Sequence, residues 1–175
     1  MDVDTVGETL ELTITQIDIV VQDNAARKMG TREEQYHSCI SFTVGEGDGS
    51  NPVYDHIDNE FFSPFYRSAR LVLQEITGLT AENLEEDSVG LFLKEYKARF
   101  VQELRVGDSV MIYSKFIEDK SSPFYALKAK HVMVREGVFV HEKIDTLVFT
   151  DLENGGFLSN LVNYDRIRGI VDSLK

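Results

Sequence analysis

Apolar residues recur every three or four positions between residues 58 and 77, which is the spacing of one face of an α-helix. They are Phe62, Phe65, Tyr66, Ala69, Val72, Leu73 and Ile76. Gly78 follows directly and is a natural stop. Asp58 could cap the start, in which case Pro64 must kink the helix, or Ser63 could cap it with Pro64 at the first helical position. The pattern therefore predicts one long helix, ending at Thr77, with a broad apolar face.

Segments on both sides of this helix alternate as β-strands do. Residues 36–44 place Tyr36, Ser38, Ile40, Phe42 and Val44 on one face and the residues between them on the other. After the helix, strands are expected at 89–104, 109–118, 124–134 and 138–150, separated by turn sequences. Because no crossover helices separate them, we expect a curved antiparallel meander.

The two ends of the chain add smaller elements. Residues 10–14 and 17–21 alternate in shifted phase, which predicts an extra N-terminal strand with a bulge near Gln16. After Asn154-Gly155-Gly156, apolar residues at helical spacing from Leu158 to Leu174 predict a last helix. The order of elements indicates an α+β domain, because a helix with so broad an apolar face needs a sheet curved around it.

The net charge of the chain narrows the classes of molecule that it is expected to bind. The chain has 18 basic and 30 acidic residues, a formal net charge of −12. Such a surface repels phosphate backbones and anionic lipid, so we expect no nucleic-acid and no membrane partner. It also disfavours a phosphorylated substrate unless basic residues gather locally, as Lys94, Lys97 and Arg99, or Lys128 and Lys130, could do. Plain solvent-facing charge is the more ordinary interpretation of these strand residues.

Cys39 is the single cysteine of the chain, so no disulfide can form within it. A reducing, cytoplasmic location is expected, with Cys39 as a packed and inert thiol. The acidic first eight residues do not resemble a signal peptide, and no apolar run approaches the roughly 20 residues that span a bilayer.

Two stretches carry a resemblance to a known family. His56-Ile57-Asp58-Asn59-Glu60-Phe61-Phe62-Ser63-Pro64-Phe65-Tyr66-Arg67-Ser68-Ala69-Arg70 resembles the family's Gly-His-Val-Asn-Asn-x-x-Tyr segment and the helix after it. Residues 97–110, with Gly107-Asp108 at a turn, are similar to its strand-turn-strand. The family is that of the hotdog-fold thioesterases, in the 4-hydroxybenzoyl-CoA-thioesterase-like branch.

The resemblance covers about residues 36–152. It implies a hotdog core over 36–152, an N-terminal extension over 1–35 and a C-terminal helix over 153–175 packed on the same domain. Hotdog sheets characteristically pair edge to edge, so a homodimer or tetramer is expected.

The same resemblance implies an active site at the start of the long helix. The amides there would bind the thioester oxygen, since they lack intrahelical partners and carry the positive end of the helix dipole. His56 and Asn59 would orient the loop and the thioester, and Asp55, Asp58 and Phe62 are expected to contact the substrate. Caps of the helix start and a pairing of His56 with Asp55 are the structural alternatives.

The catalytic carboxylate is the point where this chain departs from the family. The family's aspartate usually stands four to seven residues before the histidine, where this chain has Gly49, Ser50, Asn51 and Pro52. Of the nearby carboxylates Glu46, Asp48 and Asp55, we select Asp48, because its neighbours Gly47 and Gly49 free the backbone to turn it inward. Otherwise the carboxylate has been lost.

The leading hypothesis is an acyl-thioester hydrolase acting on an acyl-CoA or acyl-carrier-protein thioester. The alternatives are a catalytically silent hotdog protein that binds an acyl group or serves as a scaffold, and a dehydratase or hydratase. No cofactor is expected, coenzyme A being part of the substrate. No metal is expected either, because His37, His56, His131 and His141 lack metal-ligand spacing.

Overall fold

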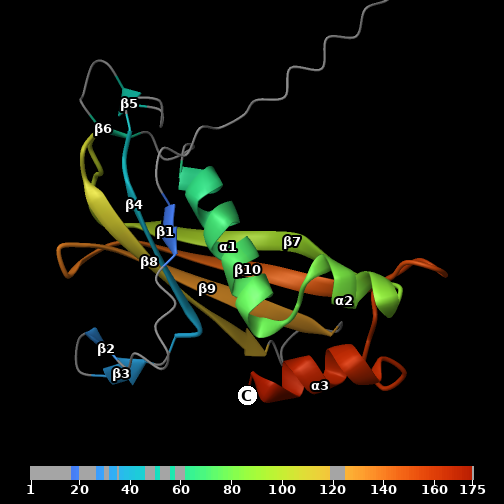
Figure 1. Cartoon of the computed structure of the whole chain (residues 1–175). Helices are drawn as coiled ribbons and strands as arrows, with labels where there is room; N and C mark the ends of the chain where they lie inside the picture. Colours follow the sequence, from blue (N-terminus) through green and yellow to red (C-terminus); the bar gives the residue numbers. More distant parts are fainter. Residues whose placement is uncertain are drawn as a thin grey trace, which may run out of the picture.

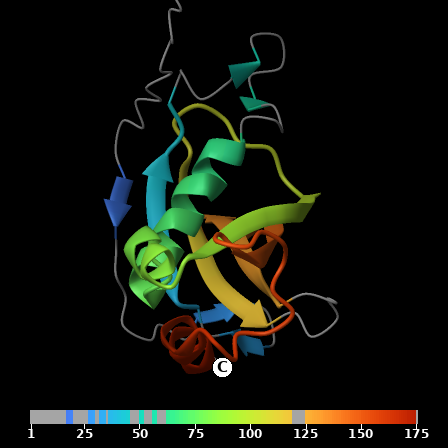
Figure 2. The ribbon, with the colours of Figure 1, turned by 90° about the vertical axis from the view of Figure 1, so that its right-hand side faces the viewer.

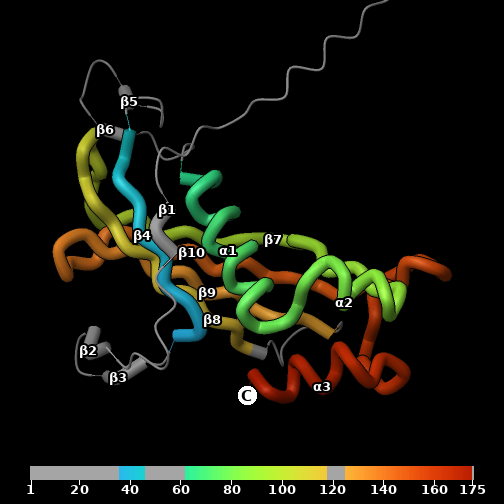
Figure 3. Tube along the Cα trace, viewed as in Figure 1, coloured from blue at the N-terminus to red at the C-terminus, as the bar shows by residue number. Residues whose placement is uncertain are grey.

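The computed structural model describes residues 36–45, 62–118 and 125–174, and of the remainder only the backbone of short strands at 17–19, 27–29, 32–34, 50–51 and 56–57. Figure 3 colours the three longer ranges along the chain. The predicted strand at 10–14 and the bulge near Gln16 lie outside the described residues.

Six strands form one antiparallel sheet in the order β1-β4-β8-β9-β10-β7 (Figure 1). They are β1 (Ile17–Ile19), β4 (Ser38–Thr43), β7 (Val89–Phe100), β8 (Ser109–Glu118), β9 (Ala126–Arg135) and β10 (Val138–Asp151). Two short pairs stand apart: β2 (Arg27–Met29) with β3 (Arg32–Glu34), and β5 (Ser50–Asn51) with β6 (His56–Ile57).

The order corrects the expected meander at one place, because β7 pairs with β10 and not with β8. The strand ends at Phe100 and not at Leu104. Residues 101–108 then cross the end of the sheet. The amides of Val101 and Gln102 both donate to the carbonyl of Val140, and the amide of Gly107 donates to that of Val44. A link of this length does not form a hairpin, so β7 can occupy the far edge.

Helix α1 (Ser63–Thr77) lies across the inner face of the sheet, with β4 and β7 on either side of it (Figures 1 and 2). It begins at Ser63, after Phe62 at the N-cap, so Pro64 falls in the first turn and no kink is needed. Gly78 ends it at φ 79°, a left-handed conformation that glycine adopts without steric cost. The buried side is formed by Phe65, Tyr66, Ala69 and Leu73.

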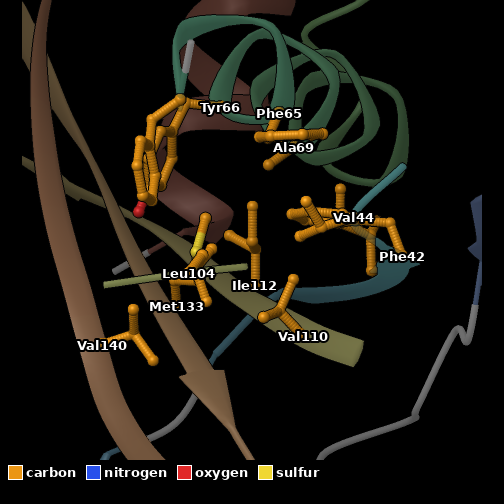
Figure 4. Packing of buried hydrophobic residues seen from close by; sticks show 12 residues of the cluster. Phe42, Val44, Phe65, Tyr66, Ala69, Leu104, Val110, Ile112, Met133 and Val140 are labelled. Atoms are coloured by element: carbon orange, nitrogen blue, oxygen red, sulfur yellow. The ribbon is translucent and has the colours of Figure 1, made fainter. Parts of the chain in front are cut away.

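The apolar side of α1 and the inner face of the sheet form a core in two parts. One part packs the first half of α1 against β4, β8 and the crossing segment, and Figure 4 shows its side chains converging between helix and sheet. Its members include Ile40, Phe42, Val44, Phe65, Tyr66, Ala69, Leu104, Val110, Ile112, Met133 and Val140. The other part contains Leu73, Phe149 and Ile167, and extends beneath two shorter helices.

These shorter helices were only partly predicted. The pattern did not predict α2 (Ala81–Glu86), which is capped by the Thr80 hydroxyl accepting from the Asn83 amide. The C-terminal helix α3 (Asp165–Ser173) begins later than the apolar spacing indicated. Leu158 is extended, because its amide donates to Phe149 and its carbonyl accepts from Tyr125.

The outer face of the sheet has a separate apolar cluster around Cys39, Tyr113 and Val132. Cys39 is buried, as expected of a packed thiol. Tyr36 belongs to this outer cluster and not to the face of Ile40, because it precedes β4 and a bend at His37 interrupts the alternation.

A long helix held by a curved antiparallel sheet, with an added edge strand and a C-terminal helix, is the hotdog fold that the sequence predicted. None of the helices in the described part of the chain is long and apolar enough to cross a membrane.

Leu73 tests the packing of α1, because its side chain is 0% exposed between helix and sheet. We expect Leu73→Ala to lower the free energy of unfolding by about 2–5 kcal/mol, the usual cost of such a cavity. Leu71→Ala is the matched control on the same helix, since Leu71 is 55% exposed. Urea denaturation measures both, and equal losses would contradict the placement of α1.

Candidate active site

A cavity of about 260 Å³ opens where the first turn of α1 faces β7 and β10. Its walls are formed by Phe62, Ser63, Tyr66, Tyr96, Ala98, Phe100, His141 and Lys143. Pairing places Ala98 opposite Lys143 and Phe100 opposite His141, so these residues share the face of the sheet that α1 covers. The cavity is thus a gap in the core at the end of the helix where unpaired amides lie.

The first turn of α1 is open to a ligand. Its N-cap residue, Phe62, makes no side-chain hydrogen bond to the helix, and the first turn contains no acidic residue. Pro64 lacks an amide hydrogen, and the amide of Tyr66 bonds to the carbonyl of the N-cap residue, so the amides of Ser63 and Phe65 are the donors of this end. The positive end of the helix dipole adds to them, which favours an oxygen that carries or develops negative charge.

Tyr66 and His141 form a buried pair against the cavity. The Tyr66 hydroxyl is hydrogen-bonded to Nδ1 of His141, whose residue is 1% exposed. The His141 ring also packs on Phe62 and Phe100, with centroids 5.1 and 4.1 Å away. Within the described chain its Nε2 is buried and has no hydrogen-bond partner. A buried polar atom without a partner is costly, so a ligand atom is a natural complement to it.

Both members of the pair are neutral. Burial, with the positive charge of Lys143, lowers the pKa of His141 from 6.5 to about 4. Burial, with the negative charges of Glu142 and Asp145, raises the pKa of Tyr66 well above 10. If the phenol donates to Nδ1, the single ring proton lies on Nε2, and His141 is a hydrogen-bond donor beside the cavity.

A buried carboxylate, that of Asp145, lies near three basic side chains next to the Tyr66–His141 pair. Asp145 is 0% exposed, and its Oδ2 accepts from Arg70 Nη1 of α1 at 3.1 Å. Lys143 Nζ lies 3.0 Å from its Oδ1. His131 Nε2 is 3.8 Å from Oδ2, and the Nδ1 of His131 is 2.7 Å from the Ser114 hydroxyl. Burial, with the charges of Lys143 and Arg70, lowers the pKa of His131 to about 3, so that ring is neutral as well.

The structure describes only some of the site residues that the resemblance implies. Phe62 is buried and lines the cavity, as expected of a substrate contact. His56 lies in β6, paired with Asn51 of β5, in the segment that leads to α1. Asp48, Asp55, Asp58 and Asn59 lie outside the described residues, and their predicted roles stay predictions.

Two of the cations considered for phosphate binding, Lys97 and Lys130, lie on the other face of the sheet. Lys97 pairs opposite Ile144 and Ile144 opposite Lys130, which makes one row across β7, β10 and β9. Ile144 directly follows Lys143 in β10, and successive side chains of a strand point to opposite faces of the sheet. Lys97 and Lys130 therefore point away from the cavity that Lys143 lines.

His141, Lys143 and Asp145 were not predicted as site residues. Their signal in the sequence is a run of three polar residues at every second position of a strand, on the face that faces the core. Buried polar residues in such a row need partners, and Tyr66 and Arg70 supply them from α1.

Comparison with known proteins gives a consistent picture. Residues 21–158 match the family model of the Thioesterase-like superfamily. No curated protein matches the chain.

Solved structures share the fold at low identity. A hypothetical protein from Thermus thermophilus is 19% identical over 78% of this chain and 98% of its own, with a TM-score of 0.62. A 1,4-dihydroxy-2-naphthoyl-CoA thioesterase from Synechocystis is 12% identical over 78% and 96%, with a TM-score of 0.62. A hypothetical protein from Staphylococcus aureus, in complex with CoA, is 12% identical over 78% and 85%, with a TM-score of 0.63.

The buried histidines make stability depend on pH. Above pH 6.5 His131 and His141 are neutral in both the folded and the unfolded chain and contribute no pH dependence. Between pH 6.5 and about 4 the unfolded chain takes up protons that the folded protein excludes. We therefore expect the free energy of unfolding to fall by about 1.4 kcal/mol per histidine for each pH unit in that window.

Urea denaturation at pH 7.5 and pH 5.5 measures this loss. His131→Asn retains a polar group near the Ser114 hydroxyl, but asparagine does not titrate. Between pH 7.5 and pH 5.5 the free energy of unfolding of this variant should therefore fall less than that of the parent protein, by the contribution of one histidine. An equal pH dependence in the variant and the parent protein would show that His131 is not held neutral.

Proposed function

The chain belongs to the thioesterase-like superfamily, and we propose that it hydrolyses acyl thioesters in the cavity at the start of α1. The observation that supports this best is the open first turn of α1 beside a buried His141 whose Nε2 lacks a partner. Together they offer donors from two directions to one carbonyl oxygen.

In the proposed reaction the thioester carbonyl oxygen lies between these donors. Negative charge develops on this oxygen as water adds to the carbonyl carbon, and donors fixed in advance stabilise it. The amides of the first turn are fixed by the helix. The His141 ring is held by its hydrogen bond to Tyr66 and by its aromatic neighbours. Neutral His141 donates through Nε2 without taking part in a proton transfer.

A carboxylate completes the reaction. Asp48 is proposed as the group that accepts a proton from the attacking water, or that attacks the carbonyl itself. The tetrahedral intermediate then collapses, the carbon–sulfur bond breaks, and the thiolate leaves and is protonated. When water is the nucleophile this step yields the carboxylic acid, and when Asp48 attacks it yields an acyl–aspartyl anhydride that water hydrolyses in a second step. His56 and Asn59 are proposed to orient the loop and the thioester, with Asp55 and Asp58 near the substrate.

The cavity limits which part of the substrate it can hold. Its 260 Å³ is slightly less than the roughly 300–1,000 Å³ of sites for drug-sized ligands. A short acyl group fits, whereas coenzyme A or a carrier-protein arm would have to lie outside. The complex of a similar fold with CoA supports an acyl-CoA substrate.

One observation favours a second function, the binding of an acyl group without hydrolysis. Among the described residues that line the cavity there is no carboxylate. If the loop before α1 does not bring Asp48 to the thioester, the cavity retains binding and loses catalysis.

Hydrolysis is tested on a panel of acyl-CoA thioesters by detection of the released thiol. We expect turnover on short acyl groups, and we expect Asp48→Asn to lower kcat/KM by roughly 10² or more while the protein stays folded. Asp172→Asn, on the exposed side of α3, is the control and should leave kcat/KM unchanged. Full activity of Asp48→Asn would exclude Asp48, and an inactive parent protein that still binds the acyl group would favour the second function.

A homodimer through β7 is the second part of the proposal. β7 is twelve residues long and stands at the end of the sheet, where no other described strand pairs with its outer edge. It exposes Phe92, Leu93, Tyr96 and Phe100, of which Tyr96 is 60% exposed and also lines the cavity. A long, apolar edge strand is a template for pairing. A second copy on this edge would cover Tyr96 and close the cavity wall.

Light scattering should give a mass of about 40 kDa, twice the 19.9 kDa of one chain. Phe92→Asp places a charge on the paired edge and should raise the dimer dissociation constant at least about tenfold. Val162→Asp is the control, because Val162 is exposed in the loop before α3. A monomeric parent protein at micromolar concentration would contradict the dimer.

A further inference from the structure

We infer that the cavity selects acyl groups whose far end bears a carboxylate, and that Lys143 binds this carboxylate. The inference rests on the proposed function, because it names the substrate class of the same cavity. It concerns the acyl end of the thioester, whereas the helix amides and His141 bind the carbonyl end.

The charges around Asp145 do not balance. One carboxylate is buried with two cations, Arg70 at 3.1 Å and Lys143 at 3.0 Å. The histidine beside it, His131, is neutral, so it neither adds to the positive charge nor removes it. Among the described residues the group carries one net positive charge, and burying an uncompensated charge is costly. An anionic ligand would offset this cost.

Lys143 is the cation of this group that faces the cavity. It is one of the lining residues, and its side chain is 9% exposed. Its Nζ lies 4.8 Å from the ring centroid of Tyr96 and 5.7 Å from that of Tyr66, the two tyrosines of the cavity wall. Arg70 is not a lining residue and lies behind this wall. A ligand in the cavity therefore meets Lys143.

Within the described part of the chain, the other groups around Lys143 leave its charge uncompensated on the cavity side. From β7 it faces Tyr96 and Ala98, which are uncharged. From β10 it meets Asp145, whose other oxygen is already held by Arg70. Glu142 points to the opposite face, where its Oε2 lies 3.5 Å from Lys130 Nζ. Lys143 and Asp145 Oδ1 form an ion pair without a hydrogen bond, so the hydrogens of the ammonium are available to a ligand oxygen.

The aromatic walls strengthen such a contact and limit its length. Phe62, Tyr66, Tyr96 and Phe100 line the cavity, and a charge-assisted hydrogen bond is stronger than one between neutral groups. With the thioester at the first turn of α1, a volume of 260 Å³ leaves room for a short chain between the two ends. A short dicarboxylic acyl group matches both ends, since one carboxyl forms the thioester and the other stays free.

The test compares thioesters that differ only at the far end of the acyl group. Succinyl-, glutaryl- and adipyl-CoA are paired with butyryl-, pentanoyl- and hexanoyl-CoA, and kcat/KM is measured for each after subtraction of the uncatalysed rate. We expect the parent protein to prefer the carboxylate-ended member of at least one pair by about tenfold or more, as a charge-assisted hydrogen bond predicts.

Variants of Lys143 assign the preference to its charge. Lys143→Met keeps a similar length without charge and should remove the preference, whereas Lys143→Arg keeps the charge and should retain part of it. Lys97→Met is the control, because Lys97 lies on the outer face of the neighbouring strand. Circular dichroism verifies that each variant is folded. An unchanged preference in Lys143→Met, or no preference in the parent protein, would show that Lys143 serves only as a partner of Asp145.

Binding separates this inference from the proposed hydrolysis. Monomethyl glutarate has an ester in place of the thioester and a free carboxylate, and methyl pentanoate lacks that carboxylate. Monomethyl glutarate should raise the Tm of the parent protein more than methyl pentanoate does, and Lys143→Met should abolish the difference. This result without hydrolysis of any thioester would refute the proposed activity alone, whereas hydrolysis with no difference in binding would refute the anionic selectivity alone.

Discussion

The buried charge of Asp145 is the constraint around which the site is organised. A carboxylate that is 0% exposed can stay ionised only if cations and hydrogen bonds surround it. Arg70 supplies one of them from the middle of α1, and this contact fixes how the helix lies on the sheet. Because α1 also supplies the amides at the cavity, the position of Asp145 bears on the position of the proposed oxygen site. Removal of Asp145 would leave the charges of Arg70 and Lys143 without their shared partner in the core, a loss that apolar packing could not compensate.

The same geometry explains how two polar contacts arise from one helix. Tyr66 and Arg70 are four residues apart and so lie on the same side of α1. Their partners His141 and Asp145 are also four residues apart, which places them on the same face of β10. Two residues on one side of α1 thus contact two residues on one face of β10. Lys143 lies between His141 and Asp145 on that face. Apolar residues in this row would pack well and cost less, so the polar row is better explained by a ligand than by stability.

The sequence predicted the fold well because the fold depends on local patterns. The helical spacing of Phe65, Ala69 and Leu73, together with Gly78, determined where α1 ends, and alternation located the long strands. Two features were wrong or missing because they depend on contacts that are remote in sequence. The placement of β7 beside β10 is set by the crossing of residues 101–108, and α2 is too short to leave a periodic pattern.

The site was less predictable for the same reason. Phe62 could be expected from the motif before α1, and it lies at the cavity. The roles of His141, Lys143 and Asp145 become apparent only when the sheet places them under α1, because they lie 75 or more residues after the residues of α1 that they contact. A row of polar residues at alternate positions is an ambiguous pattern, because it is also the pattern of a solvent-facing strand. The signal becomes specific only when the same face is known to be buried.

The overall charge of the chain acts against the substrates proposed for it, and this makes the local charges decisive. A net charge of −12 repels coenzyme A and dicarboxylic acyl groups alike. In physiological salt such repulsion between exposed charges is largely screened beyond about 8 Å, whereas charges in a cavity of low polarity are screened far less. Lys143 and the first turn of α1 act inside that distance, since both line one small cavity. An acidic protein can therefore bind an anionic acyl group, provided that the positive groups are buried where the ligand must lie, and this is the arrangement that α1 and β10 create.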